Sequence, residues 1–187
     1  TSALKHHGIN GRKYQFAPMP SLSGYSKGWN YNKVDRKKDG LQIYIDGSYV
    51  SVEFYQLGKK LSTASYRDGE PDGWFYVYDT NRKKDGRQHY IDDNYLSTEF
   101  YDHGQKIAKG SYRKSLPNGW FYRYHKRKKQ GVQNYVDGNY WTVEGYTAGK
   151  KEGLSGSYRN GIKDGWHYIY QNGKKISEIY YSEGTAK

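Results

Sequence analysis

Aromatic side chains recur at every second position in three segments of the chain. These segments span residues 74–78, 120–124 and 166–170, and each reads Trp-x-Tyr-x-Tyr. A period of two is the spacing of side chains on one face of a β-strand, so each segment is predicted to be a strand with a continuous aromatic face. Because large rings bury about 150–250 Å² each, we expect this aromatic face to form the core.

Asp-Gly and Asn-Gly pairs punctuate the chain and predict tight turns, because they supply the positive φ angles that two-residue hairpin turns require. They include the pairs at residues 39–40, 46–47, 68–69, 72–73, 85–86, 160–161, 164–165 and 172–173. No window shows a sustained apolar period of 3.6 residues, and Ala and Leu are scarce, so almost no helix is expected. The predicted elements are therefore strands of about 5–7 residues joined into hairpins.

The chain contains an internal repeat of about 46 residues. Gly-Trp pairs at residues 28–29, 73–74, 119–120 and 165–166 are separated by 45, 46 and 46 residues. They define repeat 1 (residues 25–65), repeat 2 (66–111), repeat 3 (112–157) and a truncated repeat 4 (158–187). In repeat 4 the Trp-containing strand leads directly into the Tyr-x-x-Gly turn at residues 170–173. In the other repeats the equivalent turn follows the Trp about half a period later. The elementary unit is therefore about 23 residues, and each longer repeat is two hairpins.

Residues 158–174 resemble the MORN-repeat variant, a short hairpin repeat of bacterial proteins that are often labelled antitoxin-like. The segment reads YRNGIKDGWHYIYQNGK, close to the family pattern Tyr-x-Asn-Gly followed by Gly, Trp, Tyr and Asn-Gly-Lys. The resemblance covers about residues 25–187 and departs from the pattern at longer Arg-Lys-Lys turns and at residues 115–117. It implies stacked hairpins that contact mainly their neighbours. The predicted fold is all-β, an elongated single-sheet meander of stacked antiparallel β-hairpins.

Residues 1–24 do not join the repeat domain of residues 25–187. Pro18 and Pro20 interrupt any strand there, so the stretch is predicted to be irregular, either a cap over the open edge of the first hairpin or a tail. The alternation of Tyr14 and Phe16 favours the cap.

The composition excludes several classes of protein. Leu, Ile, Val and Phe account for only 29 of the 187 residues, whereas Tyr occurs 23 times and Trp 5 times, so aromatic rings are expected to replace aliphatic packing. The chain has no Cys, which excludes disulfides, thiolate zinc sites and Cys nucleophiles. No apolar run approaches the 18–20 residues, roughly, that a bilayer crossing needs, so no membrane span is expected. These features leave the localisation open.

Motifs of catalysis are missing from the sequence. The six His residues occupy no repeating position and no metal-ligand spacing, and neither a nucleophile elbow nor a phosphate-binding loop occurs. Glu53, Glu99 and Glu144 recur at one position of the repeat, but equivalent residues lie about 19 Å apart, too far for a carboxylate pair. Each is expected to pair with a cross-strand Lys or Arg. We therefore expect no enzyme activity, no metal site and no cofactor.

A cationic turn that returns in three successive repeats is the main candidate binding site. Stacking of the repeats would place these clusters in a column about 19 Å apart, carrying much of the net charge of +12. The alternative is that exposed turns carry Lys and Arg for solubility. Trp141 joins the candidate site as the one ring expected to be an exposed ligand platform. The candidate residues are Arg36, Lys37, Lys38, Arg82, Lys83, Lys84, Arg127, Lys128, Lys129 and Trp141.

The sequence supports more than one function. The first hypothesis is a non-enzymatic repeat scaffold that binds another macromolecule, an acidic protein, through its basic, Tyr-rich hairpins. A second hypothesis is polyanion binding, to nucleic acid, anionic phospholipid or a charged polysaccharide. A third is recognition of a glycan or cell wall through Trp and Tyr. The antitoxin-like label of the resembling family adds the possibility of an acidic toxin as partner.

Overall fold

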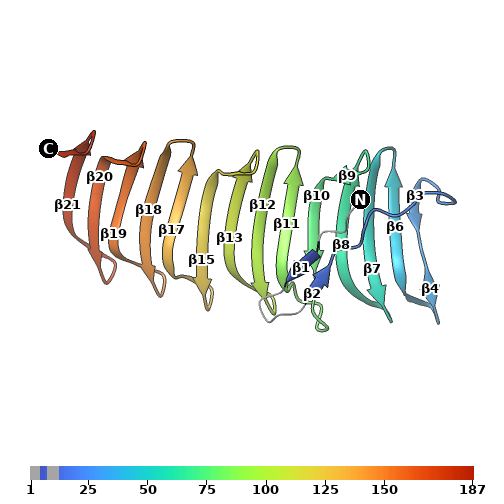
Figure 1. Ribbon diagram of the computed structural model, residues 1–187. Coiled ribbons are helices and arrows are strands. Elements are labelled where there is room, and N and C mark those ends of the chain that lie inside the picture. The colour runs from blue at the N-terminus through green and yellow to red at the C-terminus, as the bar shows by residue number, and fades with distance from the viewer. Residues whose placement is uncertain (1–4, 8–12) are drawn as a thin grey trace. The chain divides into compact units, whose positions relative to one another are not determined.

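The structure is a computed structural model that describes residues 5–7 and 13–187, with side chains described from residue 16 onward. All of its described regular structure is β, and consecutive strands pair antiparallel as a meander of hairpins (Figure 1). The predicted all-β hairpin fold is therefore confirmed. The chain divides into two compact units, an N-terminal unit ending at residue 105 and a C-terminal unit of residues 106–187.

The N-terminal unit contains seven main strands in chain order, each hydrogen-bonded to the next. They are β3 (Gly28–Asn30), β6 (Gly40–Asp46), β7 (Tyr49–Gln56), β8 (Lys59–Arg67), β10 (Gly73–Val77), β11 (Gly86–Asp92) and β12 (Tyr95–Asp102). Short ladders extend the turns through β4 (Lys33–Val34), β5 (Lys37–Lys38) and β9 (Glu70–Pro71). Near the N-terminus β1 (Lys5–His7) pairs with β2 (Lys13–Gln15).

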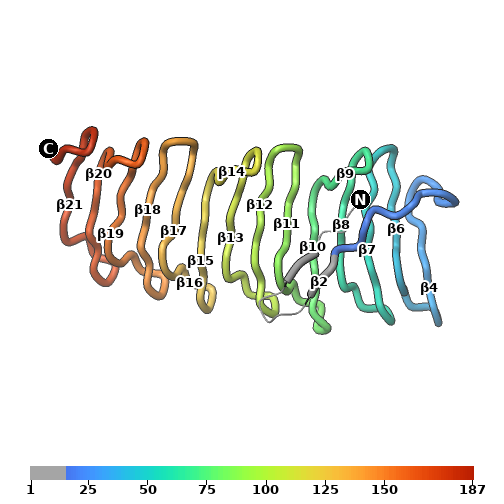
Figure 2. Tube along the Cα trace, in the orientation of Figure 1, coloured from blue at the N-terminus to red at the C-terminus, as the bar shows by residue number. Residues whose placement is uncertain are grey.

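The C-terminal unit repeats this arrangement with longer strands, and Figure 2 shows the chain trace running back and forth through it. Its main strands are β13 (Gln105–Arg113), β15 (Gly119–His125), β17 (Gly131–Asp137), β18 (Tyr140–Thr147), β19 (Lys150–Arg159), β20 (Ile162–Gln171) and β21 (Lys174–Ser182). The short strands β14 (Leu116–Pro117), β16 (Lys128–Lys129) and β22 (Thr185–Ala186) extend its turns.

The turn chemistry follows the sequence. Asn160 and Gly161, at the β19–β20 turn, have φ angles of 51° and 77°, the two positive values of a type I′ turn. The glycine before each Trp has a different role. At Gly165 φ is 94°, and a Cβ there would lie 2.6 Å from the Ser157 Oγ, which donates a hydrogen bond to the carbonyl of Asp164. Gly73 and Gly119 meet Ser65 and Ser111 in the same way, whereas Gly28 has no neighbour within 4 Å, so the feature that all four glycines share is a positive φ of 91–97°.

The core lies on the face opposite to the one that the sequence indicated. The buried side chains of the N-terminal unit are aliphatic and aromatic groups that alternate with the Trp positions: Ile43, Val50, Val52, Ala64, Tyr66, Phe75 and Val77. The four Trp of the Gly-Trp pairs are instead 39–48% exposed. The prediction that the Trp-x-Tyr-x-Tyr face forms the core is wrong, because both faces carry apolar side chains and only the other one is covered.

The cover is a segment of residues 16–22 that precedes the repeats. Phe16 and Ala17 are buried in the core, and Met19 and Leu22 pack against it. The Phe16 ring lies edge-on to Phe75, and the Tyr66 hydroxyl donates a 2.7 Å hydrogen bond to the Ala17 carbonyl. These residues therefore cover the sheet face at β8 and β10, whereas the sequence placed a cap at the open edge of the first hairpin. Residues 1–4 and 8–12, which belong to the same predicted cap or tail, lie outside the described residues.

The C-terminal unit differs from the N-terminal unit in its burial. None of the apolar side chains in residues 106–187 is buried, and the buried side chains there are the polar Ser111, Gln133, Ser155 and His167. The apolar side chains of this sheet are therefore half-buried or exposed on both faces.

Candidate functional site: the aromatic face

The exposed Trp rings are organised by stacking on the second residue of each Trp-x-Tyr segment. Trp74 and Tyr76 have ring centroids 5.3 Å apart and an interplanar angle of 12°. The other three Trp–Tyr pairs are stacked at interplanar angles of 6–12°. A second Tyr on the next strand packs against each Trp at a tilt, as Tyr90 does against Trp74 at 4.7 Å. The aromatic face, defined here by these rings, consists of Trp29, Tyr31, Tyr44, Trp74, Tyr76, Tyr90, Trp120, Tyr122, Tyr135, Trp166, Tyr168 and Tyr180.

A lysine lies over the Tyr rings in each of the first three repeats. The Lys38 Nζ is 4.9 Å from the Tyr31 ring centroid, the Lys84 Nζ is 4.0 Å from Tyr76, and the Lys129 Nζ is 4.7 Å from Tyr122. In repeat 4, Lys175 lies over Tyr168 at 5.1 Å. These ammonium groups are attracted to the ring faces, and that of Lys175 also forms an ion pair with Glu178.

The three residues of each cationic turn therefore have different positions. The first, Arg36, Arg82 or Arg127, has a positive φ angle of 62–65° and is exposed at the turn. The second, Lys37, Lys83 or Lys128, is also exposed, and its stem lies beneath a glycine of the neighbouring turn, as at Gly58. Only the third, Lys38, Lys84 or Lys129, reaches the aromatic face. The predicted clusters exist as exposed turns, but they do not act as single groups of three charges.

A buried glutamine closes each of these turns, which the sequence analysis missed. Gln88 is buried, its Oε1 accepts a 2.6 Å hydrogen bond from the Val77 N–H, and its Nε2 donates to the Asp85 carbonyl at 2.8 Å. Gln133 makes the equivalent bonds to the Arg123 N–H and the Gln130 carbonyl. The available signal was the recurring Gly-x-Gln after each turn, which places a polar residue at an inward position.

A groove of about 360 Å³ opens on the aromatic face of the C-terminal unit. Trp120 and Trp166 line its two sides, and hydroxyl side chains together with an ion pair line its floor. The Ser155 Oγ and Thr142 Oγ1 in this floor are buried and have no hydrogen-bond partner among the described residues. The floor residues are Thr142, Glu144, Lys151, Ser155 and Ser157. The sequence analysis did not single out the hydroxyl residues, although they alternate with apolar residues on strands flanking the Trp positions.

Glu144 is held as a carboxylate at one end of this groove. Its side chain accepts hydrogen bonds from Lys151 at 3.0 Å and from the Tyr146 hydroxyl at 2.9 Å. Burial opposes the charged form, but these two bonds outweigh it and hold the pKa of Glu144 below its usual value. Burial and the hydrogen bond to Glu144 raise the pKa of Tyr146 to about 12. The expected pairing of the repeated glutamates with cross-strand lysines is confirmed here and at Glu53 with Lys60.

Trp141 does not lie where the sequence analysis expected an exposed platform. It is half-buried on the opposite face, where its ring stacks on Tyr158 with centroids 4.2 Å apart and an interplanar angle of 9°. The other four Trp, expected to be buried, are the exposed ones. Trp141 is therefore no part of the aromatic face.

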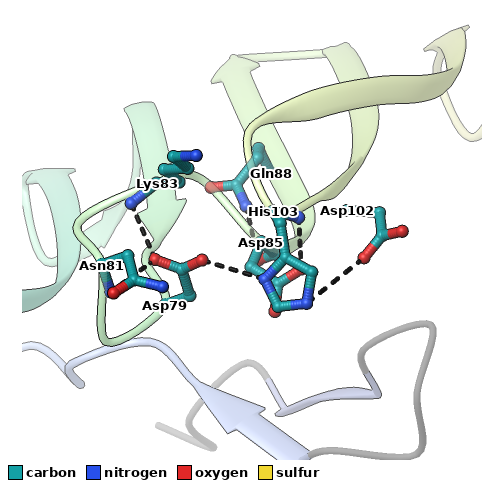
Figure 3. Close-up of polar contacts among 7 residues, drawn as sticks. All are labelled: Asp79, Asn81, Lys83, Asp85, Gln88, Asp102 and His103. Carbon is teal, nitrogen blue, oxygen red and sulfur yellow. Dashed lines mark hydrogen bonds and ion pairs between the residues drawn. The ribbon is translucent and has the colours of Figure 1, made fainter. Parts of the chain in front are cut away.

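Repeat 2 carries a polar cluster that the other repeats lack (Figure 3). The buried Asp79 accepts hydrogen bonds from the N–H groups of Asn81 and Lys83 and lies 3.0 Å from the His103 Nδ1. The hydrogen bond to Asp79 and the nearby charge of Asp85 raise the pKa of His103. Burial opposes the charge of Asp79, and the bonds from His103 and the two N–H groups lower its pKa.

The same cluster contains the one group of described side chains that could hold a metal ion. Potential ligand atoms of Asp85, Asp102 and His103 lie within 4.8 Å of one another. Sequence spacing did not reveal this group, because its members come from a turn and a strand end brought together by the β11–β12 hairpin. The expectation of no metal site stays a prediction.

Comparisons with known proteins add no family. No protein-family model matches the chain, and no curated protein matches it. Among the described residues, no helix has the length and apolarity that crossing a membrane would require.

Proposed function

We propose that the protein is a non-enzymatic binding protein whose aromatic face binds an acidic glycan chain. The observation that carries this proposal is the groove between Trp120 and Trp166, with its hydroxyl-rich floor and exposed ring walls. Its volume of about 360 Å³ falls within the range of small-molecule sites, roughly 300–1,000 Å³. One or two sugar rings would occupy such a groove.

The chemistry of the groove suits a pyranose ring. The C–H faces of a sugar pack on flat aromatic surfaces, and the stacked Trp–Tyr pairs present such surfaces with little side-chain entropy left to lose. Hydroxyl side chains line the floor beside the Glu144–Lys151 ion pair. Sugar hydroxyls both donate and accept hydrogen bonds, so this lining favours a polyhydroxylated ligand over an apolar one.

The repeat favours a polymer over a single sugar. Repeats 1 and 2 supply the same residue types, with Trp29 and Trp74 exposed and with Ser51, Thr63 and Ser65 on the strands between them. Within each unit, the two equivalent Trp are four strand spacings apart, about 19 Å. A repeating chain that contacts both of them gains affinity because its second contact is intramolecular.

The charge favours an acidic polymer. Lys129 and Lys175 lie over Tyr rings next to the Trp pairs, and Arg127 and Lys128 are exposed in the adjoining turn. The net charge of +12 raises the local concentration of any polyanion. The cationic turn of residues 127–129 would provide charge contacts for a ligand in this groove, and a non-sugar polyanion is a second candidate because of such turns.

Isothermal titration calorimetry with the full chain tests the proposal. The probes are a galacturonate hexamer and a neutral cello-hexaose, each titrated at low and high salt. The acidic hexamer is expected to bind more tightly, with an affinity that falls as salt rises. Trp120→Ala and Trp166→Ala should weaken binding at least about tenfold, by loss of ring contact. The matched control is Ile169→Ala, an exposed side chain on the opposite face.

Two results would overturn the proposal. If the double variant Trp120→Ala/Trp166→Ala keeps wild-type affinity and circular dichroism, the groove is not the site. If a polyphosphate of equal charge displaces the hexamer, and the Trp variants bind this polyphosphate as tightly as the wild type does, the protein binds polyanions through its turns. Lys126→Gln, an exposed lysine preceding Arg127, controls for the loss of one charge.

A further inference from the structure

The β12–β13 turn of repeat 2 carries an imidazole that the fold does not require. The Asp85 carboxylate closes this turn by accepting a 3.2 Å hydrogen bond from the backbone N–H of His103. The same bond recurs in the neighbouring repeats, between an acceptor side chain and a residue that is not His. The equivalent pairs are Asp39 with Leu57 in repeat 1 and Gln130 with Ala148 in repeat 3. The turn therefore needs the acceptor, but it does not need the His103 ring.

The turn between β10 and β11 also departs from the repeat, because it is one residue longer in repeat 2. Eight positions lead from the Trp to the first Arg of the cationic turn there (74 to 82), whereas seven do so in repeats 1 and 3 (29 to 36 and 120 to 127). The longer turn holds the buried Asp79, whose carboxylate lies 3.0 Å from the His103 Nδ1. The two departures from the repeat thus meet in one place (Figure 3).

The contact with Asp79 determines which nitrogen of His103 can bind a ligand. A carboxylate only accepts hydrogen bonds, so the Nδ1 carries the proton, and the neutral imidazole keeps its lone pair at Nε2. Metal-binding His residues are normally oriented in this way, by a carboxylate or carbonyl on the nitrogen that does not bind the metal. Asp79 therefore lies where an orienting group is expected, and Nε2 lies where a metal ligand is expected.

The Nε2 lone pair faces a second acceptor. The Asp102 Oδ1 lies 3.8 Å from the His103 Nε2, too far for a hydrogen bond, and it has no hydrogen-bond partner among the described residues. A cation between these two atoms would satisfy both. Zn–N and Zn–O bonds are each about 2.0–2.2 Å long, so one zinc ion spans at most about 4.3 Å between two ligand atoms. The observed separation falls within this limit.

Asp85 supplies a third ligand to the same point. Ligand atoms of Asp85, Asp102 and His103 lie within 4.8 Å of one another. The side chains of His103 and Asp102 are 52% and 47% exposed, which gives an ion access from solvent and lets these two side chains close the remaining gap. An imidazole combined with two carboxylates suits zinc, whereas calcium takes six to eight oxygen ligands, roughly, and magnesium also prefers oxygen.

We propose that Asp85, Asp102 and His103 form a zinc site, with Asp79 as the residue that positions His103. Three protein ligands leave one position of a tetrahedral zinc ion for water. The ion joins the turn before β11 to the turn after β12, at the same end of two paired strands. Zinc here would overturn the expectation, drawn from sequence spacing, that the chain has no metal site. The site uses no residue of the Trp120–Trp166 groove, so it does not depend on glycan binding.

NMR and calorimetry of the full chain, first treated with a chelator, test the site with zinc chloride as the probe. Zinc should shift the ring signals of His103 in a ¹H–¹⁵N spectrum, with the larger change at Nε2. Isothermal titration calorimetry should show zinc binding that calcium chloride does not match, with calcium at least about 100-fold weaker because the site offers too few oxygen ligands.

Repeat 3 supplies substitutions that keep the turn intact. Asp85→Gln retains a turn acceptor, as Gln130 does, and His103→Ala introduces the residue of repeat 3; each removes a ligand and should weaken zinc binding at least about tenfold. Asp79→Asn should weaken it about 10–100-fold and shift the metal-free His103 signals toward the Nε2–H tautomer. His125→Gln, at an exposed His on β15, is the matched control and should leave the affinity unchanged.

Three results would overturn the zinc site. The first is that zinc leaves the His103 ring signals of the folded protein unchanged. The second is that His103→Ala keeps both wild-type zinc affinity and wild-type circular dichroism, because zinc then binds elsewhere on the chain. The third is that calcium binds as tightly as zinc, because the ligand set is then not selective for zinc.

Discussion

Replacing Phe16 by Ala removes the anchor that covers the core of the N-terminal unit. The side chain is 1% exposed and contacts the rings of Phe75 and His89. Loss of a buried Phe costs its transfer free energy plus a term for the cavity, about 3–5 kcal/mol in total. With an urea dependence of about 2 kcal/mol/M, the unfolding midpoint of this unit should fall by about 1.5–2.5 M.

Urea titration followed by NMR measures the effect in the correct unit. The methyl signals of Val50 and Val77 report on the N-terminal core, and that of Ile179 serves as the reference in the C-terminal unit. Separate reporters are needed because two compact units need not unfold in one transition. Phe16→Leu, which keeps most of the volume, should cost less than about 1.5 kcal/mol.

A small effect would refute the reasoning. If Phe16→Ala moves the Val50 and Val77 midpoints by less than about 0.5 M, the segment of residues 16–22 does not form the second layer of this core.

Three other perturbations test separate parts of the structure. Because Asp79 raises the pKa of His103, the ion pair should stabilise the fold fully below about pH 6.5, and this contribution should be lost as pH rises through the folded-state pKa. An NMR titration of His103 should show the raised pKa. The variant Asp79→Asn should return this pKa toward its usual value. Gly165→Ala should destabilise by more than about 1 kcal/mol in thermal unfolding, since φ is 94° and the new Cβ meets the Ser157 Oγ. Trp74→Ala should cost only about 1–3 kcal/mol, less than for a buried Trp, because its ring is 44% exposed.

The hairpins were predictable because their signals are local. The period-two alternation of residues 166–170 and the positive-φ pair Asn160-Gly161 both act within a few residues, and both agree with the structure. Because the sequence repeats, the hairpin predicted for one segment could be assigned to the equivalent segments of the other repeats. The Gly-Trp pair was recognised as a signature, but the Ser hydroxyl that approaches Gly73, Gly119 and Gly165 from the neighbouring strand depends on strand pairing that no local pattern shows.

The buried face was not predictable from alternation alone. Val50 and Val52 alternate with Tyr49 and Ser51, so both faces of β7 carry apolar groups. The choice between them depends on Phe16, which precedes these strands by more than 30 residues and packs across β8 and β10. A usable signal was present nonetheless: the rings share their face with Ser, Thr, Glu and Lys, which favour solvent.

The candidate site changed for a related reason. The cationic turns are local motifs and lie where the sequence placed them, but the orientation of each residue follows from the turn geometry. Arg127 has a positive φ angle, and only Lys129 is directed onto the rings. The cluster around Asp79 and His103 joins residues 24 positions apart, which spacing rules for metal ligands do not cover.

Acrylamide quenching of tryptophan fluorescence tests the central claim most directly, because it reports on the accessibility of the rings with and without ligand. For the free protein we predict efficient quenching, dominated by Trp29, Trp74, Trp120 and Trp166, and a smaller quenching constant once the galacturonate hexamer is bound. The variant Trp141→Phe should show the same change. Weak quenching in the free folded protein would mean that these rings form a core, and unchanged quenching in the hexamer-bound protein would mean that the glycan does not bind the aromatic face.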